Sequence, residues 1–245
     1  MGLPRFFVPA MKAGCQLSLD AAESQHASSV LRVQVGDFVE VFDGCGASAQ
    51  ARIVSVKKRC VELQVGELAD SEQALEPRQV ELLVSLPKGD RQKVLVDGLT
   101  QMGVRKLTPL LCEQSVAKPN GNAVERIRRA IVESCKQCRR NTLMEVGEPV
   151  GVAELIELEA DSQDQDGCLN LIAHPYESQA LGAEFSDSLR LATHVRWLIG
   201  PEGGFTQDEV GGLVESGWKT VHFGTNILRI EMAALYVAAR SVGLQ

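Results

Sequence analysis

Several motifs that mark common enzyme classes are missing from this sequence. It contains no Gly-x-x-x-x-Gly-Lys-[Ser/Thr], no Gly-x-Gly-x-x-Gly, no His-Glu-x-x-His and no Gly-x-Ser-x-Gly. In other proteins these motifs serve phosphate binding, dinucleotide binding, zinc proteolysis and serine hydrolysis, respectively. We therefore do not expect the chain to bind nucleotide phosphates or to hydrolyse substrates through a serine nucleophile.

The sequence also lacks a long apolar run and a disulfide framework. No stretch approaches the length of a membrane span, and Pro4, Arg5 and Pro9 stand where a secretion signal needs apolar residues. The seven cysteines are odd in number and irregularly spaced, unlike those of small secreted proteins. These features predict a cytoplasmic protein with reduced cysteines and no membrane partner.

Spacing typical of metal ligands is absent as well. Cys135-Lys136-Gln137-Cys138 is the only Cys-x-x-Cys, and neither a second pair nor suitably spaced histidines accompany it. A redox dithiol is an alternative, but the surrounding pattern indicates a long basic helix. We predict no metal site and a structural role for both cysteines.

The chain is acidic overall but has one basic segment. It has 25 basic and 32 acidic residues, a net charge of −7, which argues against indiscriminate nucleic-acid binding. Residues 118–140 nevertheless contain seven basic and two acidic side chains. This helical segment either directs nucleic acid to one face or is a solvated surface, and composition does not separate the two.

The strongest positive signal is a pair of glycine-marked turns. Residues 199–205 read Ile-Gly-Pro-Glu-Gly-Gly-Phe, residues 223–229 read Phe-Gly-Thr-Asn-Ile-Leu-Arg, and each turn follows an apolar run. A capping-box pattern at 206–209 predicts a helix after the first turn. Glycines let the backbone approach a ligand closely, and loops at carboxyl strand ends bind ligands. Two turns about 25 residues apart, one β-α-β unit, can form one small-molecule pocket.

The pattern of elements changes near residue 70. Residues 1–70 are β-rich with one helix, which predicts a small barrel, and residues 69–77 form a candidate linker. From residue 78 strands and helices alternate, which predicts an α/β domain with a parallel sheet covered on both faces. We expect a loop at 161–167, helices at 19–31, 91–102, 123–140 and 230–242, and strands at 38–42, 49–56, 60–65, 80–86, 106–112, 169–174 and 195–199.

The order of short motifs along nearly the whole chain resembles a known family. The first glycine turn is followed by Ile227-Leu228-Arg229-Ile230-Glu231-Met232-Ala233. Together with the earlier motifs, this order is similar to ribosomal RNA small subunit methyltransferase E, a family of the knotted SPOUT class. The earlier motifs are Arg5-Phe6-Phe7-Val8, His26, Val30-Leu31-Arg32, Gly36-Asp37, Phe42-Asp43-Gly44, Lys88, Gly103-Val104, Gln114-Ser115 and Glu133-x-x-x-Gln137-Cys138-x-Arg140.

This resemblance implies two domains and one reaction. Residues 1–70 would form a PUA-like β-barrel that binds RNA, and residues 78–245 a SPOUT α/β domain with a parallel sheet and a deep trefoil knot. The protein would be a homodimer that uses S-adenosyl-L-methionine as its cofactor. It would methylate N3 of one uridine in 16S ribosomal RNA, free or in the small ribosomal subunit, to give 3-methyluridine.

The resemblance also implies roles for individual residues. Arg229, with Arg140 as the alternative, would stabilise negative charge on the uracil ring, and Glu231 would accept the N3 proton or orient an arginine. The expected RNA contacts are Arg5, Arg32, Lys88, Arg126, Arg129 and Lys136. The expected cofactor-binding residues are Leu171, Ala173, His174, Ile199, Gly200, Pro201, Glu202, Gly203, Gly204, Phe223, Gly224, Ile227 and Leu228.

Three residues depart from the family pattern. Ile230 and Met232 stand where threonines are usual, and Gln114 stands where arginine is usual. Two other functions compete with methylation: a non-catalytic RNA-binding factor for ribosome assembly, and a dinucleotide enzyme on an open sheet. The second lacks the glycine fingerprint and a clear ribose-binding acid.

Overall fold

A computed structural model describes residues 2–57, 59–69, 78–115, 121–160, 167–175, 179–180 and 183–242. The chain divides into two compact units: an N-terminal unit of Met1–Leu75 with Val132–Leu143, and a C-terminal unit of Glu76–Ile131 with Met144–Gln245. The grouping of residues 132–143 with the N-terminal unit is not apparent from the sequence. The expected linker beyond residue 69 and the expected loop at 161–166 lie outside the described residues.

The N-terminal unit contains a five-stranded sheet of order β1-β3-β4-β5-β2. β1 pairs with β3 in parallel, and the other pairs are antiparallel. Buried and exposed residues alternate along β4, so one face supplies the core. The strands are β1 (Arg5–Phe7), β2 (Gln16–Ser18), β3 (Phe38–Phe42), β4 (Ser48–Lys57) and β5 (Cys60–Ala69).

The segment expected to be one continuous helix at 19–31 forms a short α-helix followed by a π-helical turn. Asp20 caps α1 (Ala21–Gln25) by accepting a hydrogen bond from the Glu23 amide at 2.7 Å. The chain continues as a π-helical turn, η1 (His26–Val30), and Arg32 then adopts a left-handed φ of 55°. Helical periodicity in the sequence therefore located the helical segment correctly, but it did not reveal the wider π turn.

The C-terminal unit is built on a parallel sheet of order β11-β13-β10-β12-β6-β7-β8, with β9 also paired to β7. The central strands are nearly continuous apolar runs, as expected for a sheet buried on both faces. The strands are β6 (Gln79–Val84), β7 (Lys106–Leu111), β8 (Glu145–Val146), β9 (Val150–Gly151), β10 (Cys168–Ala173), β11 (Gln179–Ala180), β12 (His194–Ile199) and β13 (Lys219–His222).

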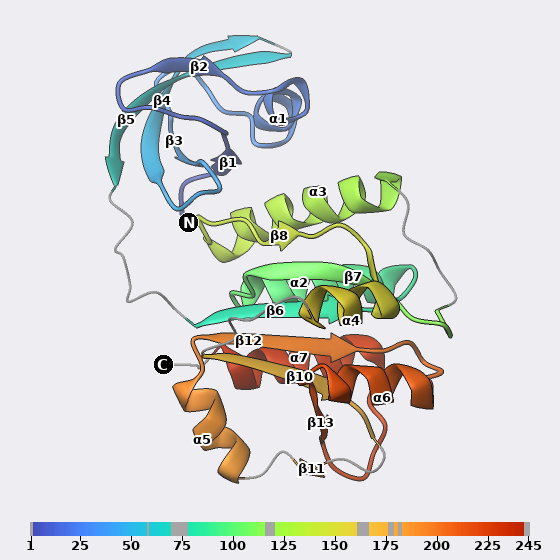
Figure 1. The fold of residues 1–245 in the computed structure, drawn as a ribbon. Helices are drawn as coiled ribbons and strands as arrows, with labels where there is room; N and C mark the ends of the chain where they lie inside the picture. Colours follow the sequence, from blue (N-terminus) through green and yellow to red (C-terminus); the bar gives the residue numbers. More distant parts are fainter. Residues whose placement is uncertain are drawn as a thin grey trace. The chain divides into compact units, whose positions relative to one another are not determined.

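Helices cover both faces of this sheet (Figure 1). α4 and α6 pack on one face, where Leu83, Ile172 and Leu198 enter one apolar cluster with Leu155 and Leu213. α2 and α7 pack together against the other face. The predicted α/β architecture with a parallel sheet is therefore confirmed. The helices of this unit are α2 (Asp90–Gln101), α4 (Val152–Ala160), α5 (Ala183–Leu191), α6 (Gln207–Glu215) and α7 (Ile230–Ser241), while α3 (Gly121–Cys138) is divided between the two units.

Candidate active site

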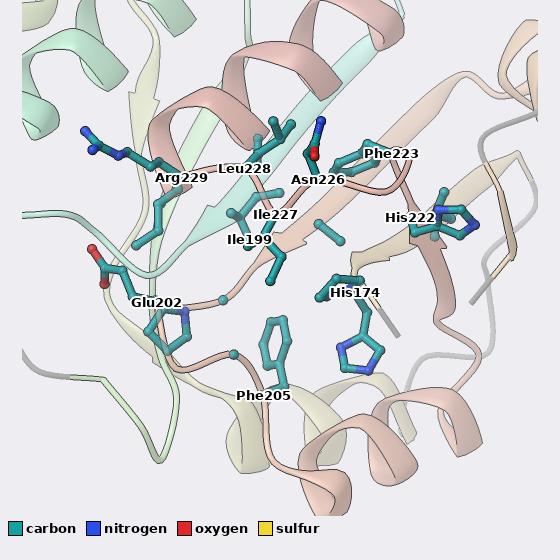
Figure 2. Close-up of a pocket in the computed structure, with 18 of the residues that line it drawn as sticks. His174, Ile199, Glu202, Phe205, His222, Phe223, Asn226, Ile227, Leu228 and Arg229 are labelled. Carbon is teal, nitrogen blue, oxygen red and sulfur yellow. The ribbon is translucent and has the colours of Figure 1, made fainter. Parts of the chain in front are cut away.

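A cavity of about 310 Å³ lies at the carboxyl ends of β10, β12 and β13 (Figure 2). Both glycine turns contribute to it, as the sequence predicts. Its walls are largely apolar, and Glu202, Arg229, His174 and His222 supply polar groups around them. This volume is at the lower end of the range for small-molecule sites, and the edge of a parallel sheet is where such sites occur.

The first turn, which we call the glycine loop (residues 199–205), needs its glycines for geometric reasons. Gly204 has a φ of 77°, and its amide donates to the Pro201 carbonyl at 2.8 Å, closing a tight turn. A Cβ at Gly200 would lie 2.9 Å from the Phe205 ring. Thr206 then caps α6 in a full capping box with Glu209. The glycines thus shape a tight turn that lines the cavity together with the side chains of Ile199 and Phe205.

The second turn follows β13 and leads into α7. Gly224 has a φ of 113°, and its amide donates to His222 Nδ1 at 3.2 Å. The Phe223 ring packs between Trp197 and Tyr236, with centroid distances of 5.8 and 5.2 Å. These aromatic contacts fix the turn, so that the 226–229 segment lines the cavity.

The cavity gathers most, but not all, of the expected cofactor-binding residues. All of them except Leu171 line it, from the end of β10 to the start of α7. Leu171 is fully buried in β10 and is not among the lining residues. Sequence reasoning missed Pro175, Val221, His222, Ile230 and Ala233, whereas Phe205 and Asn226 lie within the two turns that were expected to form the pocket. The parallel register, which places Val221 beside Ala173, would have identified one of these.

The three candidate catalytic residues are not all at the cavity. Arg229 is exposed and lines it. Glu231, in the first turn of α7, is 6% exposed, and within the described part of the chain its Oε2 has no hydrogen-bond partner. Arg140 is half-buried and belongs to the N-terminal unit. The structure therefore brings only Arg229 to the cavity directly.

Two of the expected RNA contacts are engaged inside the N-terminal unit. Arg5 is buried, donates to the Cys135 carbonyl at 2.8 Å and pairs with Glu40 at 3.3 Å. Lys136 forms ion pairs with Glu23 and Glu133, and its side chain is 13% exposed. Both side chains therefore have structural roles. Arg32, Lys88, Arg126 and Arg129 are exposed, whereas Lys118 of the basic segment lies outside the described residues.

An ion pair connects the glycine loop to α2. Arg91 Nη1 lies 2.7 Å from Glu202 Oε1, with both side chains largely exposed. The pKa of Glu202 is lowered, first by a hydrogen bond from its own backbone amide and then by Arg91. Glu202 is therefore held as a carboxylate at the rim of the cavity.

The described residues contain no group of three or more histidine, cysteine, aspartate or glutamate side chains that could hold a metal ion. Across the same residues, every helix is too short or too polar to cross a membrane. Cys135 is buried, Cys138 is half-buried, and both are free cysteines. Burial raises the pKa of Cys135 to about 11.

Comparison with known proteins identifies the class of this site. The family described as an RNA methyltransferase domain matches residues 74–241, and an RNA methyltransferase PUA domain matches residues 19–65. Ribosomal RNA small subunit methyltransferase E of Synechocystis sp. is 30% identical over 224 residues, covering 91% of this chain and 72% of the relative. The chain belongs to the family of ribosomal RNA small subunit methyltransferase E.

Another relative and two solved structures extend the match. The Bacillus subtilis protein is 29% identical over 248 residues, 96% of this chain and 94% of that protein. The crystal structure of the Neisseria gonorrhoeae protein bound to S-adenosyl methionine has a TM-score of 0.84 and 25% identity, covering 97% of this chain and 96% of that one. A Legionella pneumophila structure with the bound cofactor SAM has a TM-score of 0.85 and 26% identity over 98% and 96%.

The three departures from the family pattern lie in different environments. Ile230 is buried and lines the cavity, where a threonine hydroxyl would have offered a hydrogen bond. Met232 is 53% exposed on α7. Gln114 lies against the glycine loop, since a Cβ at Gly203 would be 2.2 Å from its Oε1.

Proposed function

We propose that this protein transfers the methyl group of S-adenosyl-L-methionine to N3 of a specific uridine in 16S ribosomal RNA, giving 3-methyluridine. The observation that carries the proposal is the cavity formed by both glycine turns at the carboxyl edge of the parallel sheet. Relatives from N. gonorrhoeae and L. pneumophila, whose chains are covered almost completely, bind S-adenosylmethionine.

The residues around the cavity suit this cofactor. Backbone groups of residues 199–204 and 224–228 hold the adenosine and methionine parts, because the glycines leave these groups accessible. Ala173 and His174 complete the wall beside β10. When bound, the cofactor supplies an activated methyl group on a positively charged sulfur. The protein's task is then alignment and charge stabilisation rather than activation.

Methylation at N3 requires the chain to handle one proton and one developing charge. Neutral uridine carries a proton on N3, so nitrogen attacks the methyl carbon only as that proton leaves. Arg229, exposed at the cavity, stabilises the negative charge that spreads over N3 and the flanking carbonyl groups. Glu231 receives the proton or orients Arg229, and Arg140 is the alternative cation.

The substrate must present an unpaired base, because N3 lies on the Watson–Crick edge. Arg32, Lys88, Arg126 and Arg129 are exposed and bind phosphate groups of 16S ribosomal RNA or the small ribosomal subunit. Arg5 and Lys136 support the N-terminal unit instead, since their charges are already paired.

Three further features belong to the same proposal. The five-stranded sheet closes as a PUA-like barrel, and the C-terminal α/β domain contains a deep trefoil knot. The protein acts in the cytoplasm as a homodimer. Exposed apolar side chains around α7 support self-association: Val94, Ile227, Leu228, Met232 and Tyr236.

Isothermal titration with S-adenosylmethionine tests the cofactor assignment. We expect saturable binding by the unmodified protein and none by Gly203→Trp, because even a Cβ at Gly203 would lie 2.2 Å from Gln114 Oε1, so a bulky side chain there must displace the glycine loop. NAD is the control ligand. Binding of NAD alone would favour a dinucleotide enzyme. Binding of RNA by both proteins without any cofactor binding would favour a ribosome-assembly factor.

A further inference from the structure

One glutamate carboxylate connects the glycine loop with the turn that follows β7. We propose that Glu209 is a positioning residue: it holds residues 112–115, here called the β7 turn, against the glycine loop, and so sets the entrance of the cofactor cavity. The inference rests on the proposed function for its ligand, and its mechanism rests on the hydrogen bonds of Glu209. It concerns residues that do not themselves line the cavity.

The two carboxylate oxygens of Glu209 accept hydrogen bonds from two different segments. Oε2 accepts from the Thr206 amide at 2.9 Å, directly after the glycine loop. Oε1 accepts from the Glu113 amide at 2.8 Å, within the β7 turn. Hydrogen bonds to an ionised carboxylate are roughly twice as strong as those between neutral groups. One side chain therefore serves both as part of a helix cap and as a bridge.

The bridged residue Glu113 is followed by the side chain that contacts the loop. Gln114 lies so close to Gly203 that a Cβ there would be 2.2 Å from its Oε1 and 3.3 Å from its Cβ. Gly203 lines the cavity. Loss of the Glu113 bond thus releases Gln114 from the outer side of the glycine loop.

The other end of the β7 turn is anchored independently of Glu209. The Cys112 amide donates to Ser115 Oγ at 2.9 Å, and this hydroxyl lies 3.1 Å from Ser85 Oγ, beyond β6. Replacing Glu209 would therefore leave β7 and its own turn folded. The expected change is confined to the contact between the turn and the loop.

The geometry requires a carboxylate rather than an amide at this position. Two separate N–H donors face two separate oxygens, and a glutamine has only one oxygen. In Glu209→Gln one donor would face an NH2 group and lose its bond. Thr206→Ala is the matched control: it removes the hydroxyl, which accepts from the Glu209 amide at 3.2 Å and donates to Oε2 at 3.4 Å, but keeps both bonds from backbone amides to the carboxylate.

The test measures S-adenosylmethionine affinity by titration calorimetry and amide hydrogen exchange at Glu113 by NMR, in the full chain. For Glu209→Gln we expect about a tenfold rise in Kd and faster Glu113 exchange. For Thr206→Ala we expect a lower melting temperature with Kd within about twofold of the unmodified protein. Equal rises in Kd for both variants, or unchanged exchange at Glu113, would overturn the inference.

A double variant identifies the path of the effect. If Glu209 acts through the β7 turn, Gln114→Ala added to Glu209→Gln should raise Kd no further, because the contact is already lost. If the two substitutions instead multiply their separate effects on Kd, the inference is contradicted. Should the unmodified protein bind no S-adenosylmethionine, the proposed function fails, and hydrogen exchange at Glu113 alone decides whether Glu209 holds the turn.

Discussion

Arg5 Nη1 donates a hydrogen bond of 2.8 Å to the carbonyl oxygen of Cys135, which lies 130 residues further along the chain. The same guanidinium contacts Asn141 and lies 4.3 Å from the centre of the Phe42 ring. Through these contacts, β1 and the end of α3 belong to one compact unit. A basic residue near the N-terminus therefore acts as an internal connector.

Replacing Arg5 should destabilise the N-terminal unit. Arg5→Met keeps much of the side-chain volume but removes the buried donors and the 3.3 Å ion pair with Glu40. The Cys135 carbonyl loses its buried donor while Glu40 keeps its ion pair with Arg139, so we expect a loss of about 1–3 kcal/mol in the free energy of unfolding. Urea denaturation followed by circular dichroism measures it. A loss below about 1 kcal/mol would contradict the structural role.

Replacing Arg32, in contrast, should weaken RNA binding without destabilising the protein. It is exposed, so Arg32→Glu should change stability by no more than about 0.5 kcal/mol. Reversing its charge should weaken binding of substrate RNA while leaving S-adenosylmethionine affinity unchanged. Filter binding at several salt concentrations and calorimetry provide the two affinities. Equal loss of both would refute the division between RNA-binding and cofactor-binding residues.

The cysteines should differ sharply in reactivity. Burial, followed by the charge of Glu209, raises the pKa of Cys112 to about 12, and burial raises that of Cys135 to about 11. Both remain protonated at pH 8.5, where alkylation requires the thiolate. Iodoacetamide should label exposed Cys45 roughly a hundredfold faster than either, as read by peptide mass spectrometry. Comparable labelling rates for all three cysteines in the folded protein would contradict the burial of Cys112 and Cys135.

The Glu202 carboxyl should titrate below an ordinary glutamate. Its pKa is lowered by its own backbone amide and by Arg91, so it favours the folded state above the unfolded pKa, about 4.3. That contribution is lost as the pH falls through the lower, folded pKa. Arg91→Gln should move the pKa upward, since one cause is removed. Carbon NMR of the side-chain carboxyl follows it, and an unchanged midpoint in Arg91→Gln would show that the ion pair is ineffective.

Local signals in the sequence were sufficient to predict the two glycine turns of the site. The capping box at Thr206 and Glu209 forms as predicted, and both glycine turns meet at one cavity. These features depend on residues close in sequence and on parallel strands ending at one edge. Leu171 shows the limit, because it lies two residues before the carboxyl end of β10 and is fully buried within the sheet, short of the cavity.

Long-range pairing was not predictable in the same way. Nothing in the basic pattern of residues 118–140 distinguishes Lys136, paired with Glu23, from exposed Arg126 and Arg129. Likewise the bridge from Glu209 to Glu113 joins residues 96 positions apart. Such contacts are fixed by tertiary packing, which a single sequence does not reveal through periodicity or propensity.

The most direct test of the central claim is nucleoside mass spectrometry after incubation of the protein with isotope-labelled S-adenosylmethionine and small ribosomal subunits from cells lacking the gene. We predict labelled 3-methyluridine in 16S ribosomal RNA and none with Gly203→Trp. A different labelled nucleoside, or no label from a protein that binds the cofactor, would contradict the proposed reaction.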